Sequence, residues 1–300
     1  MKRLLFIFTF VFCVSQFVGA QEYRNLDGME FLVLSSPESA NCYIVSRSGC
    51  FMFATVKGNS SESVGRVSSV AVLWESFGTM MDRNLGATSA TPGDVGALGL
   101  LYQWGRKDPF LGSSSISSNT LAKSTKTWPS SVDSDSSTGT IAYATAHPTT
   151  FITYNFSNYD WYYTGDSSTD NTRWTTSERN KSIYDPCPAG WRVPDGGSNG
   201  VWSKALGSSS NFYDYPYDST NEGMNFSGTF GSASTIWYLA SGFRNSDDGS
   251  LSYVGYLGSY WSASPYNSNA YGLFFSSGRS VFPLNDFIRA YGHSVRCLQE

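Results

Sequence analysis

The sequence predicts an α+β protein dominated by β-sheet with long loops. Aromatic residues make up 16% of the 300-residue chain, and 29 glycines are spread along it. Short runs of β-branched and aromatic residues alternate with Gly, Ser, Asn and Pro, which is the pattern of short strands joined by turns. At most one or two short helices fit the sequence, among them VWSKALG at Val201–Gly207.

The first twenty residues are predicted to be a targeting segment. Lys2 and Arg3 are followed by an apolar run from Leu4 to Val14, and small residues end the segment at Ala20. This pattern is typical of a secretory signal peptide over residues 1–20, and the run is shorter than the roughly 20 residues of a membrane anchor. We therefore expect an exported protein, at the cell surface, extracellular or periplasmic, with no membrane span after cleavage.

The charge balance argues against one class of partner. Cleavage after Ala20 removes 2 of the 20 basic residues and none of the 24 acidic residues, so the mature chain has a formal net charge of −6. Nucleic acids and anionic membrane surfaces select proteins with basic stripes. We therefore expect no nucleic-acid partner.

Residues 21–78 are predicted to form a small antiparallel β unit. The runs Phe31–Leu34, Cys42–Val45 and Phe51–Val56 are short and β-prone, and Ser, Pro, Asn and Gly separate them. Such spacing is typical of β-hairpins. A further strand is expected to end at Trp74, and residues 79–300 are expected to form a second, larger domain.

Several local patterns describe the larger domain. Gly93, Gly96 and Gly99 recur every three residues, but no Lys-Ser or Lys-Thr follows them, so they indicate turns rather than a phosphate-binding loop. The adjoining sequence LGLLYQWG fits either a short buried helix or a strand. Near the C-terminus, over Ala270–Phe275, Tyr271, Leu273 and Phe275 alternate with Ala270, Gly272 and Phe274. This period of two predicts a strand.

Aromatic side chains are crowded into the segment FITYNFSNYDWYYTGD, residues 151–166. Because aromatic residues bury the most area per residue, we expect this segment to contribute to the core. The alternative is an exposed platform on which sugars stack.

Four cysteines remain after cleavage: Cys42, Cys50, Cys187 and Cys297. In an exported chain an even number favours disulfides, and three connectivities are possible. A helix N-terminus is one of the environments that activate a thiol. Pro186 and Pro188 flank Cys187 and oppose the start of a helix there. A bridge from Cys187 to Cys297 would contribute about 4–5 kcal/mol in the chain-entropy model. We expect that bridge, and a second one between Cys42 and Cys50 across a turn.

Six motifs occur in a fixed order across the larger domain: MDRNLGATS, GLLYQWGRKDPF, YDPCPAGWRVP, GSYWSAS, AYGLFF and GHSVRCLQE. Together they resemble the Fibrobacter succinogenes major paralogous domain family, which is abundant in surface and secreted proteins of Bacteroidota. The likeness covers Met81 to Glu300 and implies a variant of the C-type lectin-like fold, distantly similar to formylglycine-generating enzymes. The preceding SANCYIV and FMFATVKGN resemble the β-rich leader of Bacteroidales fimbrillin-like and pilus-tip proteins.

The resemblance also implies roles for individual residues. Cys187 and Cys297 match cysteines of the family, which supports a structural bridge. Trp191, Trp261 and Arg296 fall in its signature strands and are expected to be scaffold. The calcium-and-sugar motifs of true C-type lectins, Glu-Pro-Asn or Gln-Pro-Asp followed by Trp-Asn-Asp, are missing, and PLND at residues 283–286 is only a fragment. Sugar binding through those motifs is therefore not predicted.

The turn FRNSDDGS is the candidate ligand loop. It places Arg244, Asn245, Asp247 and Asp248 between two predicted strands. Paired carboxylates with nearby carbonyl groups are able to hold Ca²⁺, which takes about 6–8 oxygen ligands. A solvated acidic turn without a metal is the simpler interpretation, so we expect no cofactor.

Three functional hypotheses follow. The preferred one is a non-catalytic surface or fimbria-associated protein that acts in adhesion or binds a ligand such as a glycan or a surface protein, and its sign is solvent-facing aromatic rings beside the SDDG turn. The second is a pilus subunit that joins fimbrial subunits by strand exchange, and its sign is an unpaired strand near Glu22–Leu34. The third, an enzyme related to formylglycine-generating enzymes, needs a redox-active cysteine pair and is not expected.

Overall fold

The structure is a computed structural model. It describes the backbone and side chains of residues 79–120, 131–175, 180–206, 211–226 and 237–300, and before these the backbone of residues 22–26, 29–33, 43–45, 51–53, 72–74 and 78. The predicted signal peptide and the predicted Cys42–Cys50 bridge lie outside the described residues. The chain divides into two compact units, Met1–Arg66 and Val67–Glu300.

In the first unit, the described residues form two antiparallel hairpins. β1 (Glu22–Leu26) pairs with β2 (Met29–Val33), and β3 (Tyr43–Val45) pairs with β4 (Phe51–Phe53). Three of these strands overlap the predicted β-prone runs. Every residue of β1 has a partner in β2, so the described residues of this segment do not show the unpaired strand that strand exchange would need.

The described part of the second unit contains short helices and many strands, in the order β5 (Val72–Trp74), β6 (Gly78–Met80), η1 (Val95–Ala97), β7 (Leu100–Gln103), β8 (Pro109–Leu111), α2 (Ile141–Ala146), β9 (Trp191–Arg192), α3 (Val201–Ala205), β10 (Gly223–Asn225), β11 (Trp237–Leu239), β12 (Phe243–Arg244), β13 (Leu251–Ser252), β14 (Leu257–Tyr266), β15 (Asn269–Ser276), β16 (Val281–Ile288), β17 (Gly292–Ser294) and β18 (Leu298–Gln299). None of the described helices is long and apolar enough to cross a bilayer.

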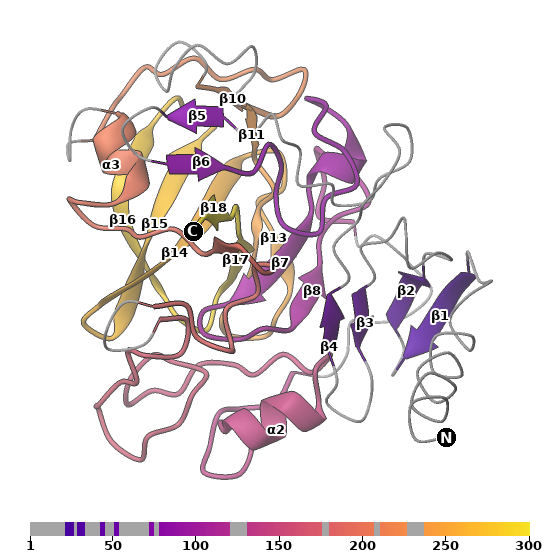
Figure 1. Ribbon diagram of the computed structural model, residues 1–300, viewed down its shortest axis with the longest axis vertical. Coiled ribbons are helices and arrows are strands. Elements are labelled where there is room, and N and C mark those ends of the chain that lie inside the picture. The colour runs from indigo at the N-terminus through magenta and orange to yellow at the C-terminus, as the bar shows by residue number, and fades with distance from the viewer. Residues whose placement is uncertain are drawn as a thin grey trace, which may run out of the picture. The chain divides into compact units, whose positions relative to one another are not determined.

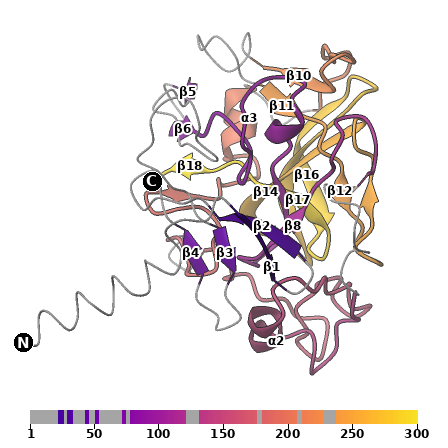
Figure 2. The same ribbon diagram turned by 90° about the vertical axis from the view of Figure 1, so that its right-hand side faces the viewer.

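The second unit is dominated by mainly antiparallel sheets, as the sequence predicts. An eight-stranded sheet has the order β13-β12-β17-β14-β15-β16, with β7 paired to β17 and β8 paired to β7. A four-stranded sheet has the order β5-β6-β18-β9, and β10 pairs with β11. Figures 1 and 2 both show α2 at the lower end of this unit and α3 at the upper end. The helices are therefore peripheral to the sheets.

The boundary between the two units lies between Arg66 and Val67, whereas the sequence predicts it after residue 78. β5 was expected in the N-terminal unit, but it pairs with β6, and Met80 of β6 pairs with Leu298 of β18. The strand that ends at Trp74 therefore belongs to the second unit, because its partner strands lie there.

Local patterns predict several elements of the second unit correctly. Val201–Ala205 is helical, and LGLLYQWG forms strand β7 rather than a helix. Gly93 and Gly99 have φ angles of 76° and 72°, in the left-handed region that glycine adopts without strain. Turns therefore account for these glycines.

The predicted strand over Ala270–Phe275 is present as β15, but its buried face changes along its length. Ala270 and Gly272 are buried in the first half, and Leu273 and Phe275 are buried in the second half. The register of β15 with β16 shifts between Gly272 and Phe274. Because a bulge re-aims the side chains that follow it, simple alternation does not hold over the whole strand.

The predicted bridge between Cys187 and Cys297 is present and spans 110 residues of sequence. Both cysteines are buried in a cluster rich in aromatic residues. Leu298, next to Cys297, pairs with Arg192 of β9. The bridge and the sheet therefore fasten the last strand to the segment that follows Cys187.

His293, in β17, is enclosed by aromatic rings. Its ring centroid lies 4.4 Å from that of Phe287 and 4.6 Å from that of Trp261. Neither ring nitrogen has a hydrogen-bond partner among the described residues, and burial lowers the pKa of His293 to about 3. The folded protein therefore holds this imidazole in its neutral form.

Acid is expected to destabilise the protein through His293. Below pH 6.5 the imidazole binds a proton in the unfolded chain, whereas in the folded protein its pKa is about 3. The free energy of unfolding therefore falls as the pH falls through this window. Urea titrations across the window should show a flatter pH dependence for His293→Leu than for the wild type. His147→Leu, which changes an exposed histidine, is the matched control for the substitution itself, and a slope for His293→Leu equal to the wild-type slope would contradict the assignment.

Candidate functional site

The predicted ligand turn connects β12 to β13 and exposes two carboxylates. The Asn245 N–H donates to the Ser250 carbonyl oxygen at 2.8 Å, and the Gly249 N–H donates to the Asn245 carbonyl oxygen at 2.9 Å. The Ser250 N–H also donates to Asp248 Oδ1 at 2.8 Å. Asp247 and Asp248 are both exposed. The turn is therefore fixed by its own backbone and presents these two side chains to solvent.

Arg244 is not an exposed member of this turn, contrary to the expectation from the sequence. It is 0% exposed. Its Nε and Nη2 donate to the Leu111 carbonyl oxygen at 3.0 and 2.6 Å, and its Nη1 donates to the Gly249 carbonyl oxygen at 2.6 Å. Burial lowers the pKa of Arg244 to about 9. The guanidinium therefore holds the turn against β8 and does not face an external ligand.

The turn does not form a cage of carboxylates. Within the residues that the structure describes, no three His, Cys, Asp or Glu side chains are grouped so that they could hold a metal ion. Asp247 Oδ1 instead accepts a hydrogen bond from the Ser246 hydroxyl at 2.9 Å. The calcium hypothesis therefore gains no support from this turn.

Three aromatic side chains lie beside the turn, and we call Tyr154, Phe156 and Tyr159 the aromatic platform. The Tyr154 N–H donates to the Ser246 carbonyl oxygen at 3.1 Å, which joins the platform to the turn. The Tyr154 ring centroid lies 4.8 Å from that of Phe156 and 5.9 Å from that of Tyr159. Phe156 is 82% exposed and Tyr159 is 46% exposed. The platform is therefore a solvent-facing group of rings.

The platform is also an electrostatic neighbour of the turn. Partial loss of solvent around the ring, and then the negative charge of Asp247, raise the pKa of the Tyr154 hydroxyl. A flat apolar surface and a hydrogen-bond acceptor are thus placed side by side.

Asn155 shapes the loop that carries the platform. Its N–H donates to the Asp160 carbonyl oxygen at 3.0 Å, and its own carbonyl oxygen accepts from the Tyr159 N–H at 2.8 Å. Its side-chain Oδ1 accepts from the Ser157 N–H at 2.7 Å. Tyr159 has a φ of 54°, a left-handed conformation that a non-glycine residue keeps only where its surroundings hold it.

The crowded aromatic segment is divided between core and surface. Phe151 and Trp161 are 0% exposed, and Trp161 Nε1 donates to the Trp104 carbonyl oxygen at 2.7 Å. The expectation of a core segment therefore holds for these residues, whereas Phe156 and Tyr159, which lie between them in sequence, are exposed.

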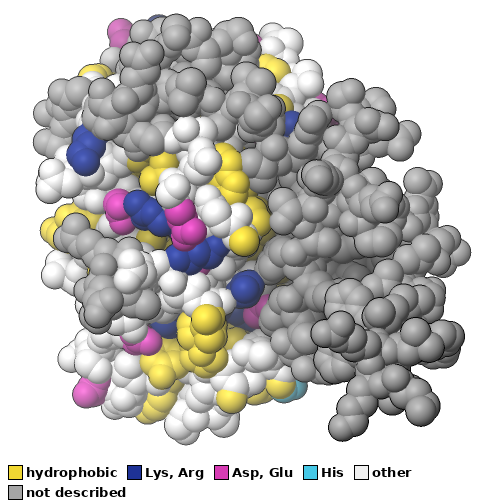
Figure 3. Space-filling model, viewed as in Figure 1, with side chains coloured by type: hydrophobic (Ala, Val, Ile, Leu, Met, Phe, Trp, Pro, Cys, Tyr) yellow, Lys and Arg dark blue, Asp and Glu magenta, His cyan; other side chains and the backbone are white. Residues whose placement is uncertain are grey.

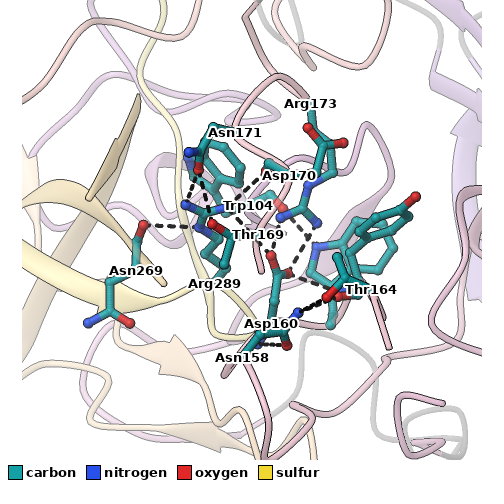
Figure 4. Close-up of polar contacts among 12 residues, drawn as sticks. Trp104, Asn158, Asp160, Thr164, Thr169, Asp170, Asn171, Arg173, Asn269 and Arg289 are labelled. Atoms are coloured by element: carbon teal, nitrogen blue, oxygen red, sulfur yellow. Dashed lines mark hydrogen bonds and ion pairs between the residues drawn. The ribbon is translucent and has the colours of Figure 1, made fainter. Parts of the chain in front are cut away.

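A buried ion cluster anchors the loop directly after the platform (Figure 4). Arg173 Nη1 donates to Asp160 Oδ1 at 3.1 Å, and Arg289 Nη1 lies 3.6 Å from Asp160 Oδ2. All three side chains are 0–1% exposed. Arg289 Nε also donates to the Asn269 carbonyl oxygen at 3.0 Å, and its guanidinium lies 4.4 Å from the Trp104 ring centroid. The cluster therefore fastens the platform loop to the start of β15.

Charged side chains of both signs are mixed on the surface of the protein. On the face shown in Figure 3, Lys and Arg side chains lie next to Asp and Glu side chains in the middle of the described surface. The described part of this face therefore carries no broad patch of one sign.

Comparison of the chain with protein-family models, curated proteins and solved structures finds no match. The resemblance to the major paralogous domain family therefore stays a prediction, and function is inferred from the site itself.

Proposed function

We propose that this protein is an exported, non-catalytic glycan-binding module of the C-type lectin-like class that acts in adhesion at the cell surface. The observation that carries the proposal is the aromatic platform beside the SDDG turn, which is the sign expected of a lectin-like role. Exposed Phe156 is central to it, because a phenyl ring that is 82% exposed gains nothing from contact with water.

The chemistry of the platform favours a neutral glycan. The C–H face of a pyranose ring is apolar and stacks on a flat aromatic ring, which removes both surfaces from water. The hydroxyl groups of the same sugar are donors for the carboxylates of Asp247 and Asp248. An anionic polysaccharide would be repelled by these two charges. The expected ligand is therefore a glycan without carboxylate or sulfate groups at the contact.

The non-catalytic part of the proposal is supported by the state of the cysteines. Chemistry of the formylglycine-generating type needs free or exchangeable thiols, whereas Cys187 and Cys297 are bonded to each other and buried. A buried structural disulfide offers no thiolate nucleophile.

A glycan array probed with the mature protein tests the proposal. We expect neutral glycans to bind, and we expect the binding to survive EDTA because ring stacking needs no metal. The double variant Phe156→Ala/Tyr159→Ala should lose at least about tenfold in affinity, the loss of about 1.4 kcal/mol or more expected for contact residues at the centre of an interface.

The matched control is Tyr213→Ala, which removes another exposed ring, 70% exposed and outside the platform. It should bind as the wild type does. An array without neutral-glycan hits, or the same neutral-glycan hits with the double variant, would contradict the proposal, and an array without any hits would favour a structural role.

A further inference from the structure

A polar pocket of about 570 Å³ lies in the second unit and shares no residue with the aromatic platform. Its walls come from the loop at residues 171–175, the turn at residues 195–199, α3, β14 and the start of β15. Small-molecule pockets typically have volumes of about 300–1,000 Å³. The pocket is therefore large enough for one or two sugar rings.

The floor of the pocket is a glycine turn packed on a tyrosine. The Gly196 N–H donates to Ser264 Oγ at 2.9 Å, and a Cβ at Gly196 would collide with the side chain of Ser262. Gly197 has a φ of 79°, and a Cβ there would lie 3.4 Å from the Tyr271 ring. The collision at Gly196 and the left-handed φ of Gly197 therefore require glycine at both positions. Tyr271 is partly exposed, so a ring edge and a rigid backbone are preformed in the floor.

The rim of the pocket contains a hydrogen-bond donor with a fixed orientation. Asn171 Oδ1 accepts from Arg289 Nη2 at 2.6 Å, so its oxygen faces the buried ion cluster and its nitrogen faces away (Figure 4). The Asn171 amide nitrogen makes no hydrogen bond within the described residues. The ion cluster that supports the platform therefore also orients one group of this pocket.

The lining carries one uncompensated positive charge. Asp195 Oδ2 accepts from Arg192 Nη2 at 2.8 Å, so the charge of Asp195 is countered from outside the lining. Lys204 of α3 is exposed and forms no ion pair with any residue that the structure describes. The pocket therefore favours a ligand with a negative charge.

The turn also contains GGSNG, residues 196–200, which matches the GxSxG pattern of serine hydrolases. A serine nucleophile needs an adjacent base. The two histidines of the chain are His147, at the end of α2, and His293, which is enclosed by aromatic rings, and neither lines the pocket. The turn is therefore interpreted as part of a binding site.

We propose that this pocket binds a sugar residue that carries a carboxylate, the chemical class of uronic and sialic acids. The Lys204 ammonium binds the carboxylate, Asn171 and Asp195 bind hydroxyl groups, and Tyr271 contacts the C–H face of the ring. This ligand class is anionic, whereas the one expected at the platform is neutral, so the pocket is a second and independent site.

Calorimetry with D-glucuronate, N-acetylneuraminate and neutral D-glucose tests the assignment. We expect one of the two acidic sugars to bind about tenfold more tightly than glucose, the effect of one charge-assisted contact. Lys204→Met should remove this preference, and Lys204→Arg should retain it. Arg279→Met, which removes an exposed cation outside the pocket, should bind as the wild type does.

The two sites can be judged separately. The platform variant Phe156→Ala/Tyr159→Ala should keep the full affinity for the acidic sugar. The pocket assignment would be overturned if neither acidic sugar bound more tightly than glucose, or if Lys204→Met kept the preference. Neither result would affect the neutral-glycan hits of the array, and an array without neutral-glycan hits would leave the pocket measurement unchanged.

Discussion

Replacing Cys187 and Cys297 together with alanine is expected to lower the free energy of unfolding by about 4–5 kcal/mol. The bridge closes a loop of 110 residues, and in the chain-entropy model a loop of that length restricts the unfolded chain strongly. Alanine is preferable to serine because both positions are buried, and a hydroxyl there would need a hydrogen-bond partner. Urea unfolding of the wild type and the double variant measures the difference.

Reduction separates the bridge from the effect of the substitutions. Dithiothreitol should lower the urea midpoint of the wild type by a large amount. In the chain without the predicted signal peptide, any change that it causes in the double variant belongs to Cys42 and Cys50, the two other cysteines. Alkylation provides the counter-test: if the unreduced protein were alkylated at Cys187 and Cys297, the structural bridge would be refuted.

The structural role of Cys187 was predictable from the local sequence, whereas its pairing with Cys297 was one of three possible connectivities. Two prolines around Cys187 oppose an activated thiol, and the predicted export favours pairing of the remaining cysteines. The helix at Val201–Ala205 and the strand over Ala270–Phe275 were predictable for the same reason, since their patterns occupy a few consecutive residues. The order of strands in the eight-stranded sheet was not predictable. β17 pairs with β7, which lies about 190 residues earlier, and only tertiary contacts determine such a pairing.

Arg244 shows why the burial of a single residue cannot be predicted from the sequence. An arginine next to Asn, Ser and Asp has the composition of a surface turn. One of its partners is the Leu111 carbonyl oxygen, 133 residues away in sequence, and that contact makes the residue part of the core. Lys204 and Asn171 were missed for the related reason that the pocket is assembled from separate segments.

The aromatic segment was predictable only in part. Phe151, Phe156 and Trp161 are all aromatic and evenly spaced, yet Phe151 and Trp161 are buried and Phe156 is exposed. The difference arises from Trp104, whose carbonyl oxygen accepts from Trp161, and from the turn at Asn155, which directs the middle of the segment outward. The sequence predicts an exposed aromatic platform only as an alternative to a core segment. It also indicates that exposed rings of a lectin-like protein would lie beside the SDDG turn.

Replacing Asp160 with asparagine is expected to lower the free energy of unfolding by about 3–5 kcal/mol. The substitution keeps the shape of the side chain and removes its charge. Arg173 and Arg289, which are 1% and 0% exposed, would then remain as two buried cations without the carboxylate that they share. Because a buried charge that loses its partner keeps its desolvation cost, the loss is much larger than that of a surface ion pair.

Asp214→Asn is the matched control, since it makes the same chemical change in an exposed pair. Asp214 lies 3.1 Å from Arg279, and the two side chains are 85% and 52% exposed. Its removal should cost less than about 1 kcal/mol, because water screens such pairs. Urea unfolding of both variants measures the contrast, and equal losses would show that the Asp160 cluster does not hold the loop.

The Asp160 variant should also connect stability to binding. Asp160 follows Tyr159 of the platform, and Arg289 orients Asn171 at the rim of the pocket. Loss of the shared carboxylate should therefore weaken neutral-glycan binding at the platform and acidic-sugar binding in the pocket together, under conditions in which the variant is still folded. The substitutions at Phe156 and Lys204 should each affect one site alone. A variant at Asp160 that was destabilised but bound both ligands normally would show that the cluster stabilises the core without positioning either site.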